Sequence, residues 1–232
     1  MLRLLAFFVG VFFALRVLQL VPGVGWLFHG FFGFWLTAIG LAWGLSVLSA
    51  RWESRRRLKR QIDALGQVDN PHVRGKRGAL RLASGDARGA LPDLEAAAAG
   101  EHDVAEWAYR LGLARLALGD ARAAAAELAR AEQLDADCAY GGVQLALARA
   151  ELARGEPRRA LDALERFERA RDQTAESAYL RGLVLARTGR GPEARAQFAS
   201  VAAIVARTPQ FQRKAQRPWM WRAWLGRLGL AR

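Results

Sequence analysis

The chain has 232 residues, of which 52% are hydrophobic, and a net charge of +13. This hydrophobic content excludes an intrinsically disordered chain, and the single cysteine, Cys138, excludes an intramolecular disulfide framework and a cysteine-based zinc site. Alanine, leucine and arginine dominate while β-branched residues are sparse after residue 50, so we expect an all-α fold.

The positive charge lies outside the central part of the chain. Residues 61–193 carry 19 basic and 21 acidic residues, whereas residues 51–60 carry six basic and one acidic, and residues 194–232 carry eight basic and none acidic. Basic charge that flanks apolar segments favours anionic membrane lipids over nucleic acid as the partner. We therefore expect no nucleic-acid binding.

Residues 1–50 are predicted to form a transmembrane helical hairpin. Residues 2–21 and the run that starts at Trp26 are both apolar and about 20 residues or longer, which is enough for one bilayer crossing each. A turn at residues 22–25 separates them. The alternative is a cleavable signal peptide. The first run is not followed by a small-residue cleavage site, and a second apolar run comes directly after it, so we favour the hairpin.

Residues 51–70 are predicted to be a basic linker at the membrane interface. Lysine and arginine next to a crossing are retained on the cytoplasmic side, so the N-terminus and the C-terminus should both be cytoplasmic. The residues of this cluster are Arg51, Arg55, Arg56, Arg57, Lys59 and Arg60. Small residues recur along both crossings at helix-packing spacing, which fits packing of the hairpin against itself or a homo-oligomer.

After residue 70 the sequence repeats itself four times. The four glycines Gly85, Gly119, Gly155 and Gly189 are separated by 34, 36 and 34 residues. A small residue stands seven positions before each glycine, an alanine five positions after it and a large apolar residue nine positions after it. The small residues are Gly78, Gly112, Ala148 and Gly182, and the large ones are Leu94, Leu128, Leu164 and Phe198.

This pattern predicts a helix, a tight turn and a second helix in each repeat. Glycine readily adopts the left-handed conformation that ends a helix, and Pro157 and Pro192 suit the first turn of the next one. The small residue lets the two helices pack closely, and the large apolar residue fills the space between them. One helical pair cannot bury its apolar face alone, so the pairs should stack into an α-solenoid.

The sequence resembles the tetratricopeptide repeat family over residues 71–206. The resemblance implies a concave groove, lined by the first helix of each unit, that holds a peptide or a partner helix. The positions of this sequence that match the groove positions of the family are His72 and Ala79 in the first unit, Glu106, Tyr109, Leu113 and Leu116 in the second, Leu145, Arg149 and Leu152 in the third, and Glu176, Tyr179 and Leu183 in the fourth. Each either contacts a partner or packs against the neighbouring repeat. Tyr109 and Tyr179 are the predicted anchors.

Residues 207–232 form a basic segment rich in tryptophan. Read as a helix, it places Trp221, Trp224, Leu225 and Leu228 on one stripe, which is typical of a helix lying on an anionic membrane. The predicted membrane-interface residues of this segment are Trp219, Trp221 and Trp224. The alternative is a terminal cap in which the tryptophans cover the apolar face of the fourth repeat. A third alternative is one helix that does both, with Arg213, Lys214 and Arg217 facing lipid.

Nothing in the sequence indicates an enzyme, a cofactor or a metal site. The histidines and Cys138 have no partner at the spacing that catalysis or metal binding needs, and the glycines are explained by the repeat turns. The chain layout resembles bacterial inner-membrane repeat proteins of envelope assembly. We expect a membrane-anchored scaffold that binds a protein at the cytoplasmic face of the inner membrane. The alternative is a subunit of an integral-membrane assembly whose repeats dock or regulate the hairpin.

Overall fold

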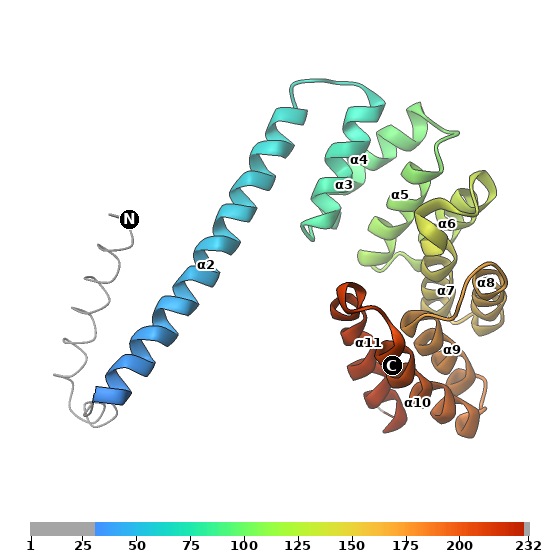
Figure 1. The fold of residues 1–232 in the computed structure, drawn as a ribbon. Coiled ribbons are helices and arrows are strands. Elements are labelled where there is room, and N and C mark those ends of the chain that lie inside the picture. Colours follow the sequence, from blue (N-terminus) through green and yellow to red (C-terminus); the bar gives the residue numbers. More distant parts are fainter. Residues whose placement is uncertain (1–30, 230–232) are drawn as a thin grey trace. The chain divides into compact units, whose positions relative to one another are not determined.

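The computed structural model describes residues 31–229 of the chain (Figure 1). The chain divides into two units, residues 1–64 and residues 65–232. All of the regular structure in the described residues is helical. The predicted all-α class is therefore confirmed for this part of the chain.

The first unit contains one long helix, α2 (Phe31–Leu65). It continues through most of the segment predicted as a linker, because residues 51–65 contain neither proline nor glycine. Two local contacts support its polar part: Arg57 pairs with Glu53 at 3.4 Å, and the Arg56 guanidinium lies 3.3 Å from the centre of the Trp52 ring. The side chains of Arg51 and Arg55 lie outside the described residues.

The predicted hairpin is not seen as such in the described residues. Its first crossing and residues 26–30 of the second lie outside them. Among the helices that the structure describes, none combines the length and the apolar character that a membrane crossing requires. Gly40 and Gly44 are two of the small residues that recur along the second predicted crossing. A Cβ added at either glycine would have no atom within 4 Å.

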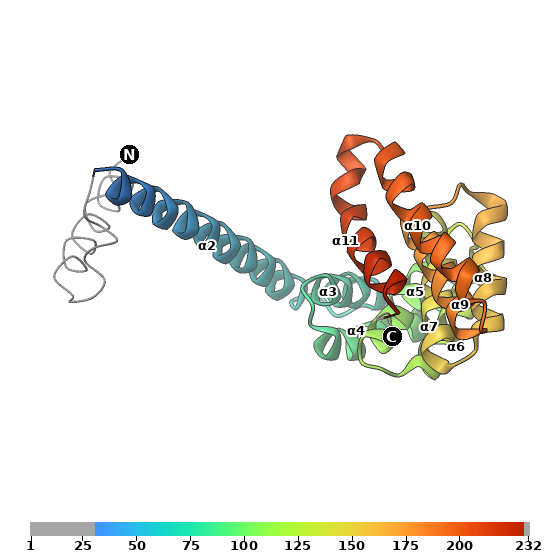
Figure 2. The same ribbon diagram turned by 90° about the horizontal axis from the view of Figure 1, so that it is seen from below.

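The second unit is a stack of four helical pairs followed by one further helix (Figures 1 and 2). The pairs are α3 (Pro71–Ala83) with α4 (Ala87–Gly100), α5 (Ala105–Ala117) with α6 (Ala121–Leu134), α7 (Gly142–Arg154) with α8 (Pro157–Ala170), and α9 (Ala175–Arg187) with α10 (Gly191–Arg207); the final helix is α11 (Gln210–Arg227). The predicted solenoid of about four repeats is confirmed.

The four spaced glycines occupy equivalent bends between the two helices of each pair. Gly85, Gly119, Gly155 and Gly189 have φ values of 89°, 87°, 81° and 79°, in the left-handed region that glycine enters without strain. In the first two repeats an aspartate then caps the second helix: Asp86 accepts a hydrogen bond from the Gly89 amide at 2.8 Å, and Asp120 accepts one from the Ala123 amide at 3.0 Å.

Small residues allow the paired helices to approach, as the spacing predicts. A Cβ added to Gly112 would lie 2.6 Å from Cγ of Leu128, and one added to Gly182 would lie 2.5 Å from Cε1 of Phe198. Carbon atoms normally stay about 3.5–4.0 Å apart, so each large apolar side chain rests directly on the glycine backbone. Leu128 is fully buried. These contacts form the core of each pair.

The connection between the second and third repeats differs from the others. Here residues 135–141 form a longer loop that ends in the short 3₁₀ helix η2 (Cys138–Gly141). Ala139 and Tyr140 both have a φ of 54°, which is unfavourable for residues other than glycine. The spacing of 36 instead of 34 residues reflects this insertion.

Candidate functional site

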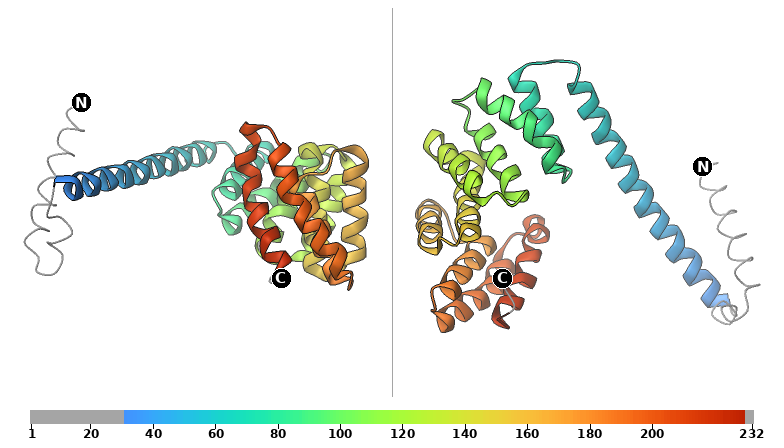
Figure 3. Two further views of the ribbon diagram at one scale, coloured as in Figure 1. Left: turned by 60° about the horizontal axis from the view of Figure 1, so that its bottom comes forward. Right: turned by 180° about the vertical axis from the view of Figure 1, so that it is seen from behind.

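The first helices of the repeats form a continuous row on one side of the second unit. Each of α3, α5, α7 and α9 contacts the next, and α11 continues the row beyond α9 (Figure 3). The groove positions predicted from the sequence lie on these helices. The structure shows which of them remain accessible.

The apolar groove positions of the third and fourth repeats are buried. Tyr179 and Leu183 are 9% and 8% exposed, and Leu145 and Leu152 are also buried in the core. The Trp219 ring of α11 lies 5.6 Å from the Tyr179 ring, measured between ring centres. The predicted anchor Tyr179 is therefore covered by the C-terminal helix of the same chain.

A partly buried ion pair occupies the middle of the row. Nε of Arg149 lies 3.4 Å from Oε1 of Glu176. Burial raises the pKa of the Glu176 carboxyl above its usual value, against the opposing influence of Arg149 and of Arg222 on α11. Burial likewise raises the pKa of the Tyr109 hydroxyl. The Glu176 carboxyl is therefore largely enclosed by the fold, whereas the Arg149 and Tyr109 side chains are only partly buried.

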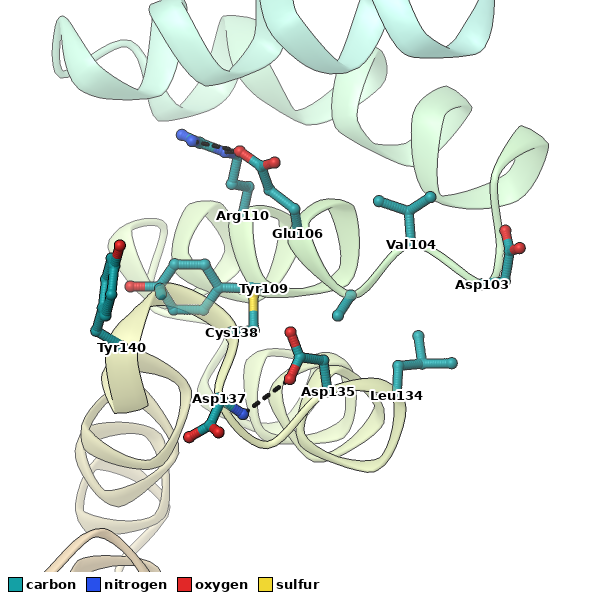
Figure 4. Close-up of a pocket in the computed structure, with 12 residues that line it drawn as sticks. Asp103, Val104, Glu106, Tyr109, Arg110, Leu134, Asp135, Asp137, Cys138 and Tyr140 are labelled. Atoms are coloured by element: carbon teal, nitrogen blue, oxygen red, sulfur yellow. Dashed lines mark hydrogen bonds and ion pairs between the residues drawn. The ribbon is translucent and has the colours of Figure 1, made fainter. Parts of the chain in front are cut away.

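An open pocket lies beside the row at the junction of the second and third repeats (Figure 4). Its volume is about 540 Å³, and it contains two of the predicted groove residues, Glu106 and Tyr109. The start of α5, the end of α6 and the following loop form its walls. The lining residues are Asp103, Val104, Ala105, Glu106, Tyr109, Arg110, Leu134, Asp135, Asp137, Cys138, Ala139 and Tyr140.

Carboxylates dominate the polar lining of this pocket. Arg110 is its one basic residue and donates to Glu106, with Nη2 2.6 Å from Oε1. Asp135 accepts a hydrogen bond from the Asp137 amide at 2.9 Å. Burial raises the pKa of the Cys138 thiol, and the nearby Asp135 and Glu106 carboxylates raise it further. Asp137 in turn pairs with Arg171, with 2.7 Å between Oδ1 and Nη2. The four carboxylates still outnumber these two cations, so the pocket has a negative potential that favours cationic groups.

The same pocket also exposes apolar surface. Tyr140 is 88% exposed and Leu134 is 41% exposed. Tyr140 is held in the left-handed conformation together with Ala139. Backbone strain of this kind costs about 1–3 kcal/mol per residue and is concentrated at functional sites. An exposed aromatic ring on a strained loop is a combination typical of recognition surfaces.

The remaining predicted groove residues have structural contacts. His72 places Nδ1 3.3 Å from Oε2 of Glu101, and its ring meets the edge of the Trp107 ring at 5.5 Å between centres. Leu113 and Leu116 are half-buried against the core of the later repeats, and Ala79 is half-buried on α3.

Sequence reasoning missed the loop residues of the pocket, Asp103, Leu134, Asp135, Asp137 and Tyr140. The only signal was the longer spacing of 36 residues between Gly119 and Gly155. The basic residues Arg56, Arg57, Lys59 and Arg60 are exposed on α2, as are Trp221 and Trp224 on α11. Within the described part of the chain, no group of three or more His, Cys, Asp and Glu side chains is arranged to hold a metal ion.

Comparison with known proteins agrees with this architecture. Residues 145–210, which cover the third and fourth repeats, match the family model of the tetratricopeptide repeat. These residues therefore belong to the tetratricopeptide repeat family. Their fold is that of a protein-interaction scaffold, and proteins of this type are generally not enzymes. No curated protein matches the sequence significantly.

Two solved structures are also similar to this chain. The crystal structure of MamA protein has a TM-score of 0.58 and 22% sequence identity, covering 66% of this chain and 85% of that one. A tetratricopeptide repeat protein from Parabacteroides merdae ATCC 43184 has a TM-score of 0.36 and 14% identity, covering 76% of this chain and 83% of that one. At this low identity, the similarity to MamA protein shows a shared fold and says nothing about a ligand.

Proposed function

We propose that this tetratricopeptide repeat protein is a scaffold that binds a basic segment of a partner protein in the pocket between its second and third repeats. The observation that carries the proposal is the contrast along the row of first helices. The fourth repeat is covered by Trp219, whereas the pocket around Tyr109 and Tyr140 is open and lined by carboxylates. Only the open part offers a recognition surface.

The chemistry of the pocket fits lysine or arginine side chains on an otherwise apolar segment. The charged end of such a side chain would lie near Asp103 or Asp135, and its aliphatic stem would cover Leu134. The Tyr140 ring can receive a guanidinium group on its face. A volume of about 540 Å³ holds a few side chains, which suits a short peptide motif better than a globular surface.

We place this scaffold at the cytoplasmic face of a bacterial inner membrane, with residues 1–50 as its anchor. The support comes from the apolar sequence of these residues and from the exposed apolar side chains of α2. Ile39, Trp43 and Leu48 are 62%, 71% and 59% exposed, which is typical of a surface that another apolar phase covers. The exposed basic cluster that follows on α2 would lie among anionic headgroups.

Photo-crosslinking in intact membranes tests the partner. Tyr140 is replaced by p-benzoylphenylalanine in the full chain, and the captured peptides are identified by mass spectrometry. We expect a partner protein whose crosslinked segment carries lysine or arginine. The variant Asp103→Lys should lose most of the capture, because it replaces a carboxylate of the pocket by a cation.

Asp162→Lys is the matched control. Asp162 is an exposed carboxylate on α8, outside the pocket, so the same change of charge there should leave capture intact. Capture of nothing but lipid or neighbouring copies of the chain would contradict the proposal. Equal loss of capture in both charge variants would contradict the assignment to this pocket.

A further inference from the structure

The two faces of α11 have opposite characters. One face packs on the repeat array: Ala223 and Gly226 are buried, and Trp219 lies on Tyr179. The packing at Gly226 is close, since a Cβ added there would lie 2.9 Å from Cε2 of Phe198. This face makes α11 the terminal cap of the solenoid.

The opposite face is apolar and exposed. Trp221 is 70% exposed, Trp224 52%, Leu225 40% and Leu228 56%. At 100° per residue these side chains point away from the face that carries Trp219, Ala223 and Gly226. The rings of Trp221 and Trp224 contact each other edge to face, with 6.3 Å between their centres. The four side chains therefore form one continuous stripe, here called the outer stripe.

An apolar outer stripe is unusual for a terminal cap. Capping helices of repeat arrays keep a polar outer face, because that face remains in water. Tryptophan is costly to expose yet favourable at the boundary between lipid headgroups and acyl chains, where the ring is half apolar and half polar. The outer stripe therefore indicates that this face of α11 contacts a non-aqueous surface.

The charge around the outer stripe selects the kind of surface. Lys214 and Arg217 lie on the same side of α11, earlier along the helix, and both are exposed. No acidic residue occurs in residues 194–232, which contain eight basic ones. A shallow apolar hollow of about 200 Å³ between α10 and α11, bordered by Trp224 and Arg227, adjoins the stripe. Basic and aromatic residues interleaved in this way match an anionic bilayer surface.

From this geometry we infer that α11 lies on an anionic membrane with its outer stripe in the headgroup region, while its inner face holds α9 and α10. One helix thus serves as both solenoid cap and membrane contact, with the two roles on opposite faces. The inference rests on α11 alone and does not require the partner-binding pocket or the N-terminal anchor. If the anchor is present, α11 supplies a second attachment point.

Site-specific fluorescence in vesicles tests this contact. In the full chain with Cys138→Ser, Leu228→Cys is labelled with an environment-sensitive fluorophore. The chain is reconstituted into vesicles of phosphatidylcholine alone or mixed with phosphatidylglycerol, each with a lipid-borne quencher. We expect quenching several-fold stronger in the mixed vesicles, and several-fold weaker after Trp221→Ser/Trp224→Ser. Lys214→Glu/Arg217→Glu should also weaken it.

The same label on Arg158→Cys serves as the control, because Arg158 is exposed on α8, away from α11. Equal quenching at the two label positions would overturn the inference. A fluorescence change of the label at position 228 that appears only after soluble proteins are added would also overturn the inference, and would indicate that the outer stripe binds a protein. Retention of the chain after an alkaline carbonate wash reports separately on the N-terminal anchor.

Discussion

Replacing Gly112 by alanine tests the close helical packing on which every repeat depends. The added methyl carbon would lie 2.6 Å from Cγ of Leu128, 2.9 Å from its Cδ2 and 3.3 Å from the Ala124 carbonyl oxygen. Contact between carbons needs about 3.5–4.0 Å, so the overlap with Leu128 is about 1 Å. Leu128 is fully buried and cannot swing away.

The expected cost follows from two opposing effects. Overpacking of a filled core costs about 1–3 kcal/mol, whereas alanine is favoured over glycine in a helix by about 1 kcal/mol. Gly112→Ala should therefore lower the free energy of unfolding by up to about 2 kcal/mol. In a chain of this size the midpoint of thermal unfolding should fall by about 2–4 °C per kcal/mol.

A double-mutant cycle with Leu128→Ala makes this prediction sharper. Leu128→Ala alone should cost about 2–5 kcal/mol, because it leaves a cavity in the core. In that background the methyl group added at Gly112 enters the cavity, so Gly112→Ala should become stabilising by up to about 1 kcal/mol. The sign of its effect thus reverses between the two backgrounds.

Denaturant unfolding followed by far-UV circular dichroism measures all four chains. Gly40→Ala is the matched control, since an added Cβ at Gly40 has no atom within 4 Å and should not destabilise α2. The reasoning would be refuted if Gly112→Ala cost the same with leucine or alanine at position 128. A stabilising effect in the unmodified chain would refute it equally.

Two further predictions concern buried charges. Asp93 is 4% exposed and accepts hydrogen bonds from Arg77 at 2.9 Å and Arg81 at 2.7 Å. Because Asp93→Ala leaves these cations unpaired, it should lower the free energy of unfolding, measured with denaturant, by about 3–5 kcal/mol. Burial raises the pKa of Glu176 in the folded state above its usual 4.5. The stability that Glu176 contributes, measured as the difference in free energy of unfolding from Glu176→Gln, should therefore be fully present below about pH 4.5 and should decrease as the pH rises through the raised pKa. A stability difference that instead grew with pH would show that the pair with Arg149 outweighs burial.

The repeat architecture could be predicted from the sequence because its causes are local. The turn glycines, the small residues seven positions earlier and the large apolar residues nine positions later all act within one helical pair of about three dozen residues. A left-handed turn and a close helical contact each require a particular residue type at a particular spacing. The positive φ of Gly85 and the contact of Gly112 with Leu128 follow from that pattern.

The accessible surface could not be predicted in the same way. Tyr109 and Tyr179 occupy the same position in their repeats, yet Tyr179 is covered by Trp219 from a helix 40 residues later, and Tyr109 lines an open pocket. The spacing of 36 residues signalled an insertion but not the left-handed Ala139 and Tyr140, because conformation there depends on the packing of α6 against α7.

The sequence by itself therefore determined the helical pairs, their turns and the basic, tryptophan-rich character of the last segment. Only the tertiary structure decided which faces are covered. It turned Trp219 inward and Trp221 and Trp224 outward on one helix, and it left the carboxylates near Tyr140 around an open pocket. The physical reason is that helix formation and close pairing depend on neighbouring residues, whereas exposure depends on segments far apart in the chain.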